Sequence, residues 1–317
     1  MRTMHALRRR RWPALLVAAL LVLPLLSSVA FAGDPVPSGS PNAPSEFLRG
    51  QAVPLRVMTY NIQYGYNGLP AGAGRALDVD GIAEVIRQAD PDVVALQEVD
   101  VHWGARSNFM DELQYLADKL GMHPYFGFIY DFDPLQPGQE RRQFGPALLS
   151  KHEILRAENH PLSRISSQQP QLGLQPLPGF PEIVINVKGN QVHIFSTHTY
   201  WLAQAVRQLE VEEMIKYLDD TKGPRILMGD FNASPDAAEM KTMAAAYKDV
   251  FANVGEGQEK TYPAIAPNER IDYIFISPEI QADRAWVVDS TASDHRPVVA
   301  DLTLLRVNPF ENGLGPQ

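Results

Sequence analysis

The sequence predicts an α/β fold, a four-layer α/β/β/α sandwich of two mixed sheets flanked by helices. Two observations predict it. Apolar strand-like runs alternate with amphipathic helical segments between residues 53 and 305. Both a tight hairpin and helical crossovers connect the runs, so each sheet is expected to mix parallel and antiparallel strands. With 317 residues, 45% of them hydrophobic and 21% charged, the chain can bury a large core.

The elements follow one another in a regular order. Strands are expected where short apolar runs lie between turn residues, over 53–60, 92–97, 147–150, 182–187, 191–197, 225–228, 271–276, 285–288 and 297–305. Helices are expected where apolar residues recur every three or four positions, over 79–88, 109–120, 202–218 and 235–247. Gly121 suits the position after a helix, and Ser234 and Pro235 suit the N-cap and first position of another. The Lys188-Gly189-Asn190 segment predicts a hairpin.

Three segments between these elements are long for the loops of a compact domain. They cover residues 63–78, 130–144 and 163–181. Long ordered loops on a rigid scaffold usually shape access to a binding site. The alternative is that these segments are surface loops without a functional role.

The first 32 residues have the pattern of a secretory signal peptide. A basic run at 8–11 precedes an apolar stretch at 13–26, and Ala-Phe-Ala at 30–32 is a small-x-small cleavage site. A retained membrane anchor is the alternative, because the apolar stretch nearly reaches spanning length. We expect residues 1–32 to be removed and the protein to be secreted, either extracellular or periplasmic.

The rest of the chain divides by composition into three parts. Residues 33–50 are rich in Pro, Ser and Gly, which predicts a flexible linker. Residues 51–308 hold all the predicted strands and helices and are expected to form one domain, followed by a C-terminal tail at 309–317. The domain is expected to be a monomer.

The charge and the cysteine count limit the function. The chain has no Cys, so neither a disulfide framework nor a lipid-modified Cys can exist. The leader holds five Arg and no acid, so its removal takes the formal net charge from −9 to −14. An acidic protein lacks the field that attracts duplex DNA, so no strong duplex binding is expected. Phosphodiester chemistry is not excluded, because a bound divalent cation supplies positive charge locally.

Polar side chains recur where the apolar strands end or begin. These residues are Asn61, Glu98, His198, Asp230, Asn232, Asp272, Asp294 and His295. A polar residue at the end of a buried strand can project into a cleft. Eight carboxylates, amides and imidazoles placed alike indicate a metal-dependent hydrolytic site.

The Gly-Asp-Phe-Asn segment at 229–232 is the strongest local signal. Asp230 and Asn232 are two apart and share one face of an extended backbone. A carboxylate can orient or deprotonate water, and an amide can donate to a phosphoryl oxygen without adding negative charge. The alternative is an Asx turn, in which these residues only bond local backbone.

The Ser-Asp-His segment at 293–295 places an acid beside an imidazole. His295 can contact a phosphoryl oxygen or act as an acid or base, and Asp272 suits holding that histidine in place. Asp294 can bind a metal. His198 could act on the leaving oxygen or contact phosphate. The alternative for each is a hydrogen-bonded strand-end or loop residue.

The expected cofactor is Mg²⁺, with Mn²⁺ as the alternative. Glu98 follows an apolar run and offers the hard oxygen ligand that these ions prefer, and Asn61 could share the ion or position the phosphate. A zinc site of the usual kinds is disfavoured, because the chain has neither Cys nor a His-Glu-x-x-His pattern.

Six segments in order resemble motifs of the endonuclease/exonuclease/phosphatase superfamily, which has a deoxyribonuclease-I-like fold and secreted bacterial-type members. They are T-Y-N-I (59–62), L-Q-E-V (96–99), S-T-H (196–198), G-D-F-N (229–232), I-D-Y-I (271–274) and S-D-H-R-P (293–297). The resemblance covers residues 53 to about 305. It implies the four-layer sandwich and Mg²⁺-dependent phosphoester cleavage by direct water attack.

The resemblance also implies roles for the matching residues. Glu98 is similar to the principal metal ligand, with Asn61 close by and Asp294 a metal-side acid. Asp230 resembles the residue that orients the attacking water, and Asn232 a phosphate or transition-state contact. His295, paired with Asp272, matches the essential histidine, as base or as electrostatic stabiliser, and His198 matches the strand-end histidine that contacts phosphate.

Three positions depart from the family pattern or extend it. Gln63 stands where abasic-site enzymes have an acid, which argues against that specialisation. Glu140 is a candidate partner for the strand-end histidine. Arg106 lies in a stretch that resembles uncharacterised secreted members and is a candidate phosphate contact, with a solvated loop arginine as the alternative.

The sequence therefore predicts a secreted metal-dependent phosphoester hydrolase whose substrate is a lipid headgroup, a small molecule or a nucleic acid. The alternatives are an extracellular nuclease of the same fold and a non-catalytic binding protein that retains the fold. Export and the aromatic residues Tyr200 and Trp201 favour a lipid headgroup and peripheral membrane contact. Core packing is the alternative for those aromatic residues.

Overall fold

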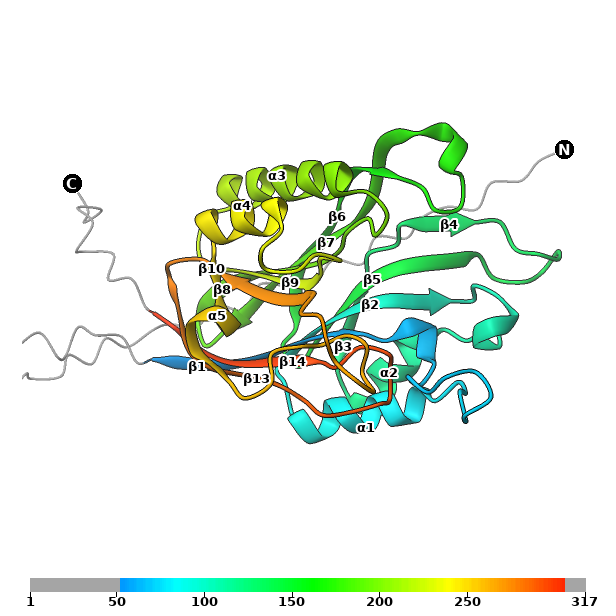
Figure 1. Ribbon diagram of the computed structural model, residues 1–317, viewed down its shortest axis with the longest axis horizontal. Helices are drawn as coiled ribbons and strands as arrows, with labels where there is room; N and C mark the ends of the chain where they lie inside the picture. The colour runs from blue at the N-terminus through cyan, green and yellow to red at the C-terminus, as the bar shows by residue number, and fades with distance from the viewer. Residues whose placement is uncertain (1–51, 306–317) are drawn as a thin grey trace, which may run out of the picture. The chain divides into compact units, whose positions relative to one another are not determined.

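Two mixed sheets lie face to face in the computed structural model, which describes residues 52–305 (Figure 1). Eight strands form the first sheet: β1 (Val53–Asn61), β2 (Val93–Val101), β3 (His123–Phe126), β4 (Tyr130–Phe132), β5 (Arg142–Ser150), β11 (Gly255–Glu256), β13 (Ile280–Val287) and β14 (Val298–Leu304). Their order in space is β11-β13-β14-β1-β2-β5-β3, and β4 pairs with β5. The pairing of β1 with β2 is parallel and that of β1 with β14 is antiparallel, so this sheet is mixed.

Six strands form the second sheet. They are β6 (Ile154–Ile165), β7 (Leu174–Val187), β8 (Asn190–His198), β9 (Arg225–Asp230), β10 (Lys248–Asp249) and β12 (Asp272–Ile276). Their order is β10-β12-β9-β8-β7-β6. The pairing of β8 with β9 is parallel and the other pairings are antiparallel.

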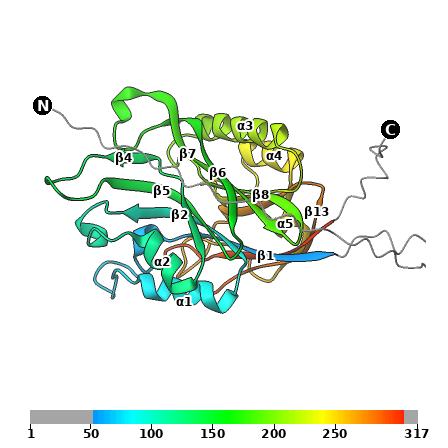
Figure 2. The same cartoon turned by 180° about the vertical axis from the view of Figure 1, so that it is seen from behind.

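Helices cover the outer face of each sheet. They are α1 (Val79–Ala89) and α2 (Glu112–Leu120) on the first sheet and α3 (Gln204–Asp220) and α4 (Ala238–Ala246) on the second. The short helix α5 (Val250–Val254) instead contacts β12 and β13, and its Val250 belongs to the apolar layer between the two sheets. Figure 2 shows α1 and α2 on one side of the paired sheets and α3 and α4 on the other. The predicted four-layer α/β/β/α sandwich is therefore confirmed.

Three apolar layers hold the four layers together. The central layer joins the inner faces of the two sheets, with Val57 and Leu148 from one and Ile194 and Met228 from the other. A second layer packs α1 and α2 on the first sheet, and a third packs α3 and α4 on the second sheet. Each fully buried side chain of this size contributes about 1.5–3 kcal/mol. The core is therefore large enough to order the strand ends without disulfides.

Most of the predicted elements are present. Gly121 ends α2 in the left-handed conformation, and the hairpin over Lys188-Gly189 joins β7 to β8, as predicted. The helix predicted over 235–247 is shorter than expected. It begins at Ala238, and the Ser234 hydroxyl donates to the Asp236 carboxylate instead of capping it.

The segment 163–181, predicted to be a loop, is a loop only over residues 166–173. It continues β6 and β7 as a paired hairpin as far as Ile165 and Leu174. The segment 130–144 contains β4 and the start of β5, so only part of it is a loop. Strand β6 was not predicted because Pro161 lies inside it, but an edge strand tolerates a proline. The predicted signal peptide (1–32), linker (33–50) and tail (309–317) lie outside the described residues.

Within residues 52–305, no helix has both the length and the apolar character needed to cross a lipid bilayer.

A buried carboxyl group lies where α2 meets the first sheet. Glu112 is 0% exposed, and one of its oxygens accepts a hydrogen bond from the backbone N–H of Asp100 while the other has no partner. Burial raises the pKa of Glu112 from 4.5 to about 9. The folded protein therefore holds a proton that the unfolded chain releases above pH 4.5. The stability that this proton contributes is complete below pH 4.5 and is lost as the pH rises to about 9.

We expect Glu112→Gln to remove this pH dependence. The glutamine oxygen can still accept from the backbone of Asp100, so the two proteins should have similar free energies of unfolding at pH 5. At pH 9 the variant should be more stable by several kcal/mol, because each pKa unit is worth about 1.4 kcal/mol. Urea unfolding at both pH values measures this, with the exposed Glu140→Gln as control. Parallel stability curves for Glu112→Gln and the unsubstituted protein would contradict it.

Candidate active site

One end of the two sheets brings the predicted polar residues together. Asn61 is the last residue of β1, His198 of β8 and Asp230 of β9. Asp272 opens β12 and pairs in register with Asp230, which also pairs with His198 on its other side. The strand ends, rather than flexible loops, therefore set the positions of these side chains.

Gly229 allows β8 and β9 to approach closely at this end. A Cβ atom at position 229 would lie 2.1 Å from the backbone oxygen of Thr197. No side chain larger than hydrogen fits there without moving one of the two strands. As a result His198 Nε2 lies 3.5 Å from Asp230 Oδ2.

Glu98 projects from a β-bulge in β2. The register between β2 and β5 shifts between Leu96 and Val99, and Glu98 has a φ of 57°. A non-glycine residue in this left-handed region is strained, and bulges of this kind re-aim side chains next to functional sites. The Glu98 side chain is 24% exposed and lies 4.0 Å from His198 Nε2. The strained backbone conformation at Glu98 therefore directs its carboxylate into the cleft.

Asn61 links the two carboxylates. Its Nδ2 donates to Glu98 Oε1 at 3.3 Å and to Asp230 Oδ2 at 3.0 Å. Its Oδ1 accepts from the backbone N–H of Gln63, which fixes the orientation of the amide. In this geometry Asn61 holds Glu98 and Asp230 side by side. Its direct coordination of a metal stays a prediction.

His295 and Asp272 form a buried pair. His295 Nδ1 lies 2.9 Å from Asp272 Oδ2, and Nε2 lies 3.7 Å from Asp230 Oδ2. The ring of Tyr262 packs 4.8 Å from the imidazole, centroid to centroid. Burial alone lowers the pKa of His295, but the negative charges of Asp272 and Asp230 outweigh it and raise the pKa to about 10. Asp272 therefore orients the ring and leaves Nε2 facing the cleft.

Burial also acts on the acids of the site. It raises the pKa of Asp230, an effect that the charge of His295 opposes. It raises the pKa of Asp294 to about 6, and the neighbouring Glu98 adds to this. Gln63 Nε2 donates to Asp294 Oδ2 at 2.5 Å, which holds that side chain in the cleft. Several carboxylates thus crowd together around His295, and a bound cation would relieve their repulsion further.

Two hydrogen bonds, one from its backbone and one from its side chain, position Asn232. Its N–H donates to Asp230 Oδ1 at 2.8 Å, and its Nδ2 donates to the backbone oxygen of Thr199 at 3.0 Å. The first of these bonds is the Asx turn that the sequence left open as an alternative. Asn232 has a φ of 48° and still lines the cleft, so the turn and a contact with substrate are compatible.

A cleft of about 430 Å³ collects nearly all of these side chains. It is lined by Glu98, His198, Trp201, Asp230, Asn232, Tyr262, Glu269, Ile271, Asp294 and His295. Asn61 and Asp272 lie just behind it, bonded to its acids and to its histidine. The structure therefore brings together eight of the nine candidate site residues.

Arg106 is the ninth candidate, and the structure places it elsewhere. Its guanidinium donates two hydrogen bonds to the buried Asp100 and lies 4.0 Å from the ring centroid of Tyr64. It is not among the residues that line the cleft. These contacts give Arg106 a structural partner, and its contact with phosphate stays a prediction.

The suggested histidine partner Glu140 is wrong. Glu140 is exposed and lines a separate depression with His102 and Phe109. Glu210 on α3 is the buried acid near His198, and the charge of His198 acts on its pKa. Sequence reasoning missed Glu210 because a glutamate inside a helical pattern resembles a solvated surface residue.

The donor set fits a hard divalent cation. Glu98, Asp230 and Asp294 offer carboxylate oxygens to one cleft, and carboxylates are the ligands that Mg²⁺ and Mn²⁺ prefer. The tighter group of Asp230, Asp272 and His295 is less suitable. There His295 Nδ1 already bonds Asp272, and its Nε2 faces Asp230.

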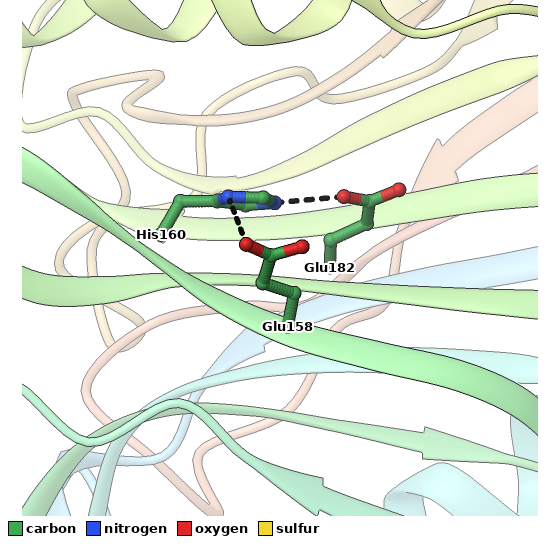
Figure 3. A group of neighbouring side chains, drawn as sticks. All are labelled: Glu158, His160 and Glu182. Atoms are coloured by element: carbon green, nitrogen blue, oxygen red, sulfur yellow. Dashed lines mark hydrogen bonds and ion pairs between the residues drawn. The ribbon is translucent and has the colours of Figure 1, made fainter.

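A second group of acids and an imidazole lies away from the cleft, with Glu158 and His160 on β6 and Glu182 on β7 (Figure 3). His193 of β8 joins this group through Glu182. His160 Nε2 lies 2.7 Å from one oxygen of Glu182, and His193 Nδ1 lies 2.6 Å from the other. Glu158 is exposed and lies 3.6 Å from His160 Nδ1. Both oxygens of Glu182 are satisfied by protein groups, so this group joins three strands rather than offering free ligands.

We expect Glu182 to stabilise the fold in a pH-dependent way. Burial raises the pKa of Glu182, but the hydrogen bonds from His160 and His193 outweigh it and lower the pKa from 4.5 to about 2. Its contribution is present above pH 4.5 and is lost as the pH falls towards 2. Glu182→Gln should therefore cost roughly 3 kcal/mol of unfolding free energy at pH 6 and much less at pH 3. Urea unfolding measures both, and an equal loss at the two pH values would refute the assignment.

The chain matches one sequence family and many solved structures. The model of the family described as "Endonuclease/Exonuclease/phosphatase family" matches residues 58–295. A protein from Schizosaccharomyces pombe, "Protein cwh43", is 27% identical over 149 residues, which are 47% of this chain. The match covers 14% of that protein, so this chain spans only a small part of its length.

Three solved structures illustrate the structural likeness. An endonuclease/exonuclease/phosphatase from Beutenbergia cavernae is 25% identical with a TM-score of 0.66, covering 80% of this chain and 72% of that one. The mannosyl-6-phosphatase of Bacteroides thetaiotaomicron is 19% identical with a TM-score of 0.58, covering 78% and 99%. The human Nocturnin catalytic domain is 21% identical with a TM-score of 0.55, covering 80% and 94%. The last two likenesses concern the fold alone.

Proposed function

The chain belongs to the endonuclease/exonuclease/phosphatase family, and we propose that it is a secreted Mg²⁺-dependent phosphoester hydrolase. Members of this family are generally hydrolases that act on phosphoesters and depend on a divalent metal. One observation carries the proposal for this chain. A buried Asp272–His295 pair faces Asp230, and Glu98 is forced into the same cleft by a strained bulge.

The mechanism we propose is direct attack by water on phosphorus. Glu98 and Asp294 would hold the cation, which supplies positive charge at the phosphoryl oxygens. Asp230 accepts a hydrogen bond from the water and takes its proton as the water oxygen bonds phosphorus. The bond from phosphorus to the leaving oxygen breaks on the opposite side, in line, and that oxygen takes a proton from solvent water.

The two histidines and Asn232 contact the oxygens of the phosphoryl group. His295 Nε2 faces the cleft and contacts a phosphoryl oxygen, with Asp272 fixing the ring. Asn232 donates a hydrogen bond to another oxygen without adding repulsion. His198, at the edge of the cleft, contacts the phosphate or the leaving oxygen.

The charge of the cleft and of the chain helps to choose between two candidate substrate classes, nucleic acids on one hand and lipid headgroups or small molecules on the other. The cleft is dominated by acids, and the full chain carries a formal net charge of −9. Tight binding of duplex DNA needs many Lys and Arg contacts with phosphates, so a nuclease is the second candidate. Trp201 lines the cleft and is 62% exposed, which rules out the alternative of core packing for this residue. An exposed indole beside the cleft favours a lipid headgroup or a small molecule. Peripheral membrane contact through Trp201 and the 61% exposed Leu202 remains part of this proposal.

A side-by-side assay tests the substrate class. Plasmid DNA, RNA, sphingomyelin, phosphatidylinositol and inositol phosphates are each incubated with the purified chain and Mg²⁺. The proposal expects release of phosphate or of a phosphorylated headgroup from the last three substrates. Exclusive cleavage of nucleic acid would support the nuclease candidate, and no turnover of any phosphoester would support a non-catalytic binding protein. Export is tested separately by sequencing the N-terminus of the mature protein, which should begin at Gly33.

A further inference from the structure

A small cavity opens directly beside the catalytic cleft. His198 and Trp201 line both the cavity and the cleft, so the two spaces adjoin at the strand-end histidine. The cavity has a volume of about 70 Å³. A single water requires roughly 10–15 Å³ on this measure, so the cavity has room for a polar group of several atoms.

The residues that line the cavity include a buried ion pair with unused hydrogen-bonding capacity. Arg164 on β6 is 4% exposed and Glu210 on α3 is 0% exposed. Arg164 Nε lies 3.1 Å from Glu210 Oε1, but the two are not aligned for a hydrogen bond. Arg164 Nε, Arg164 Nη2 and Glu210 Oε1 therefore have no hydrogen-bond partner. The other oxygen of Glu210 accepts from the backbone N–H of Tyr200 at 2.8 Å.

Unpartnered buried groups of this kind require an explanation. Each one costs about 1–3 kcal/mol, and native structures contain few of them. Here donors and an acceptor without partners belong to two neighbouring residues that line a cavity next to the catalytic centre. A ligand group that both donates and accepts hydrogen bonds would satisfy them, and the hydroxyl group has this property.

The charges and the wall residues of the cavity further limit the chemical class of ligand that it can bind. Arg164 and Glu210 neutralise each other, and the nearby cleft is acidic, so a second anion would gain little here. Tyr130 and Phe144 form part of the wall, with their rings stacked 6.2 Å apart. Aromatic rings and polar groups that line the same cavity suit the alternating C–H and O–H groups of a polyol.

We propose that this cavity is the leaving-group subsite of the enzyme and that it selects a polyhydroxylated alcohol, a sugar or a cyclitol, through Arg164 and Glu210. The assignment rests on the hydrolysis proposed above. The ester oxygen lies at His198, where cavity and cleft meet, and the hydroxyls beyond it reach the ion pair. Free sugar or inositol phosphates and the headgroup of an inositol lipid share this chemistry.

The test compares substrates that differ only in their hydroxyls. The value of kcat/KM for myo-inositol 1-phosphate is divided by that for cyclohexyl phosphate, and the methyl phosphodiesters of both alcohols are compared likewise. A site that hydrogen-bonds hydroxyls discriminates strongly against an analogue without them. The expected ratio is at least about 10. Vesicles of phosphatidylinositol in phosphatidylcholine distinguish the lipid source from the free esters.

The variants test whether the ion pair sets this ratio. Arg164→Met together with Glu210→Gln removes both charges at once, so that no unpaired charge remains buried, and thermal unfolding verifies that the double variant folds. The ratio should fall about tenfold or more. Glu210→Gln alone keeps the shape of the cavity and should lower the ratio by a smaller factor. Arg156→Met is the matched control, because Arg156 lies on the same strand with its side chain 64% exposed.

The possible results separate this assignment from the proposed function. A ratio near one, or a ratio that the folded double variant leaves unchanged, would overturn the polyol subsite even though the esters are cleaved. If neither ester nor vesicle is cleaved in the presence of Mg²⁺, the proposed hydrolysis itself fails. A high ratio that falls in the double variant but not in Arg156→Met supports both.

Discussion

Replacing His295 by Ala is expected to lower kcat/KM for every cleaved phosphoester by about 10³-fold or more. His295 Nε2 is 3.7 Å from Asp230 and faces the cleft, so its loss removes a contact that strengthens as charge develops on the phosphoryl group. Steady-state kinetics on the preferred substrate measure the effect. The control is His123→Ala, because His123 is an exposed histidine at the start of β3.

Asp272 should act through His295 and not independently of it. Asp272→Asn alone is expected to lower kcat by a smaller factor, about 10–100-fold, by leaving the ring unoriented. The double variant His295→Ala with Asp272→Asn should be no slower than His295→Ala. It also avoids leaving an unpaired carboxylate in the core, so its fold is the safer one to test. Additive losses in the double variant would show that the pair does not work as a unit.

The second large effect is expected from Glu98→Gln. This change removes one negative ligand from the cleft, so the Mg²⁺ concentration for half-maximal activity should rise by about 10²-fold and kcat should fall. Because Glu98 sits in a strained bulge among other acids, the substitution should leave the stability of the metal-free protein unchanged or raised. Activity titrated against Mg²⁺ and thermal unfolding in EDTA measure the two quantities.

A purely structural Glu98 would give the opposite pattern. The variant would then lose stability in EDTA, and its Mg²⁺ requirement would match that of the unsubstituted protein. Glu140→Gln provides the comparison for a removed negative charge outside the cleft, since Glu140 is exposed and lines a different depression.

The fold was predictable because its strands and helices carry strong periodic patterns. The apolar runs at β1, β2, β8, β9 and β12 were found from the sequence, and their polar end residues converge as expected. Strand β6 was not found, because Pro161 and alternating polar residues hide an edge strand. The start of α4 was misplaced, because Ser234 makes a local turn with Asp236 that resembles a cap.

The sequence could predict only those site residues whose positions are set by the ends of the strands. Asp230, Asp272 and His198 lie on paired register positions, so their proximity follows from topology. The bulge at Glu98 and the buried ion pair of Arg164 with Glu210 depend on tertiary packing and leave no local pattern in the sequence.

The central claim is metal-dependent hydrolysis in the cleft that contains Glu98, Asp230 and His295. The most direct measurement is turnover of bis(p-nitrophenyl) phosphate by the purified chain, first in EDTA and then with Mg²⁺ restored. Our account predicts no turnover in EDTA, full recovery with Mg²⁺ and no recovery in His295→Ala. Turnover that persists in EDTA, or that His295→Ala retains in full, would contradict it.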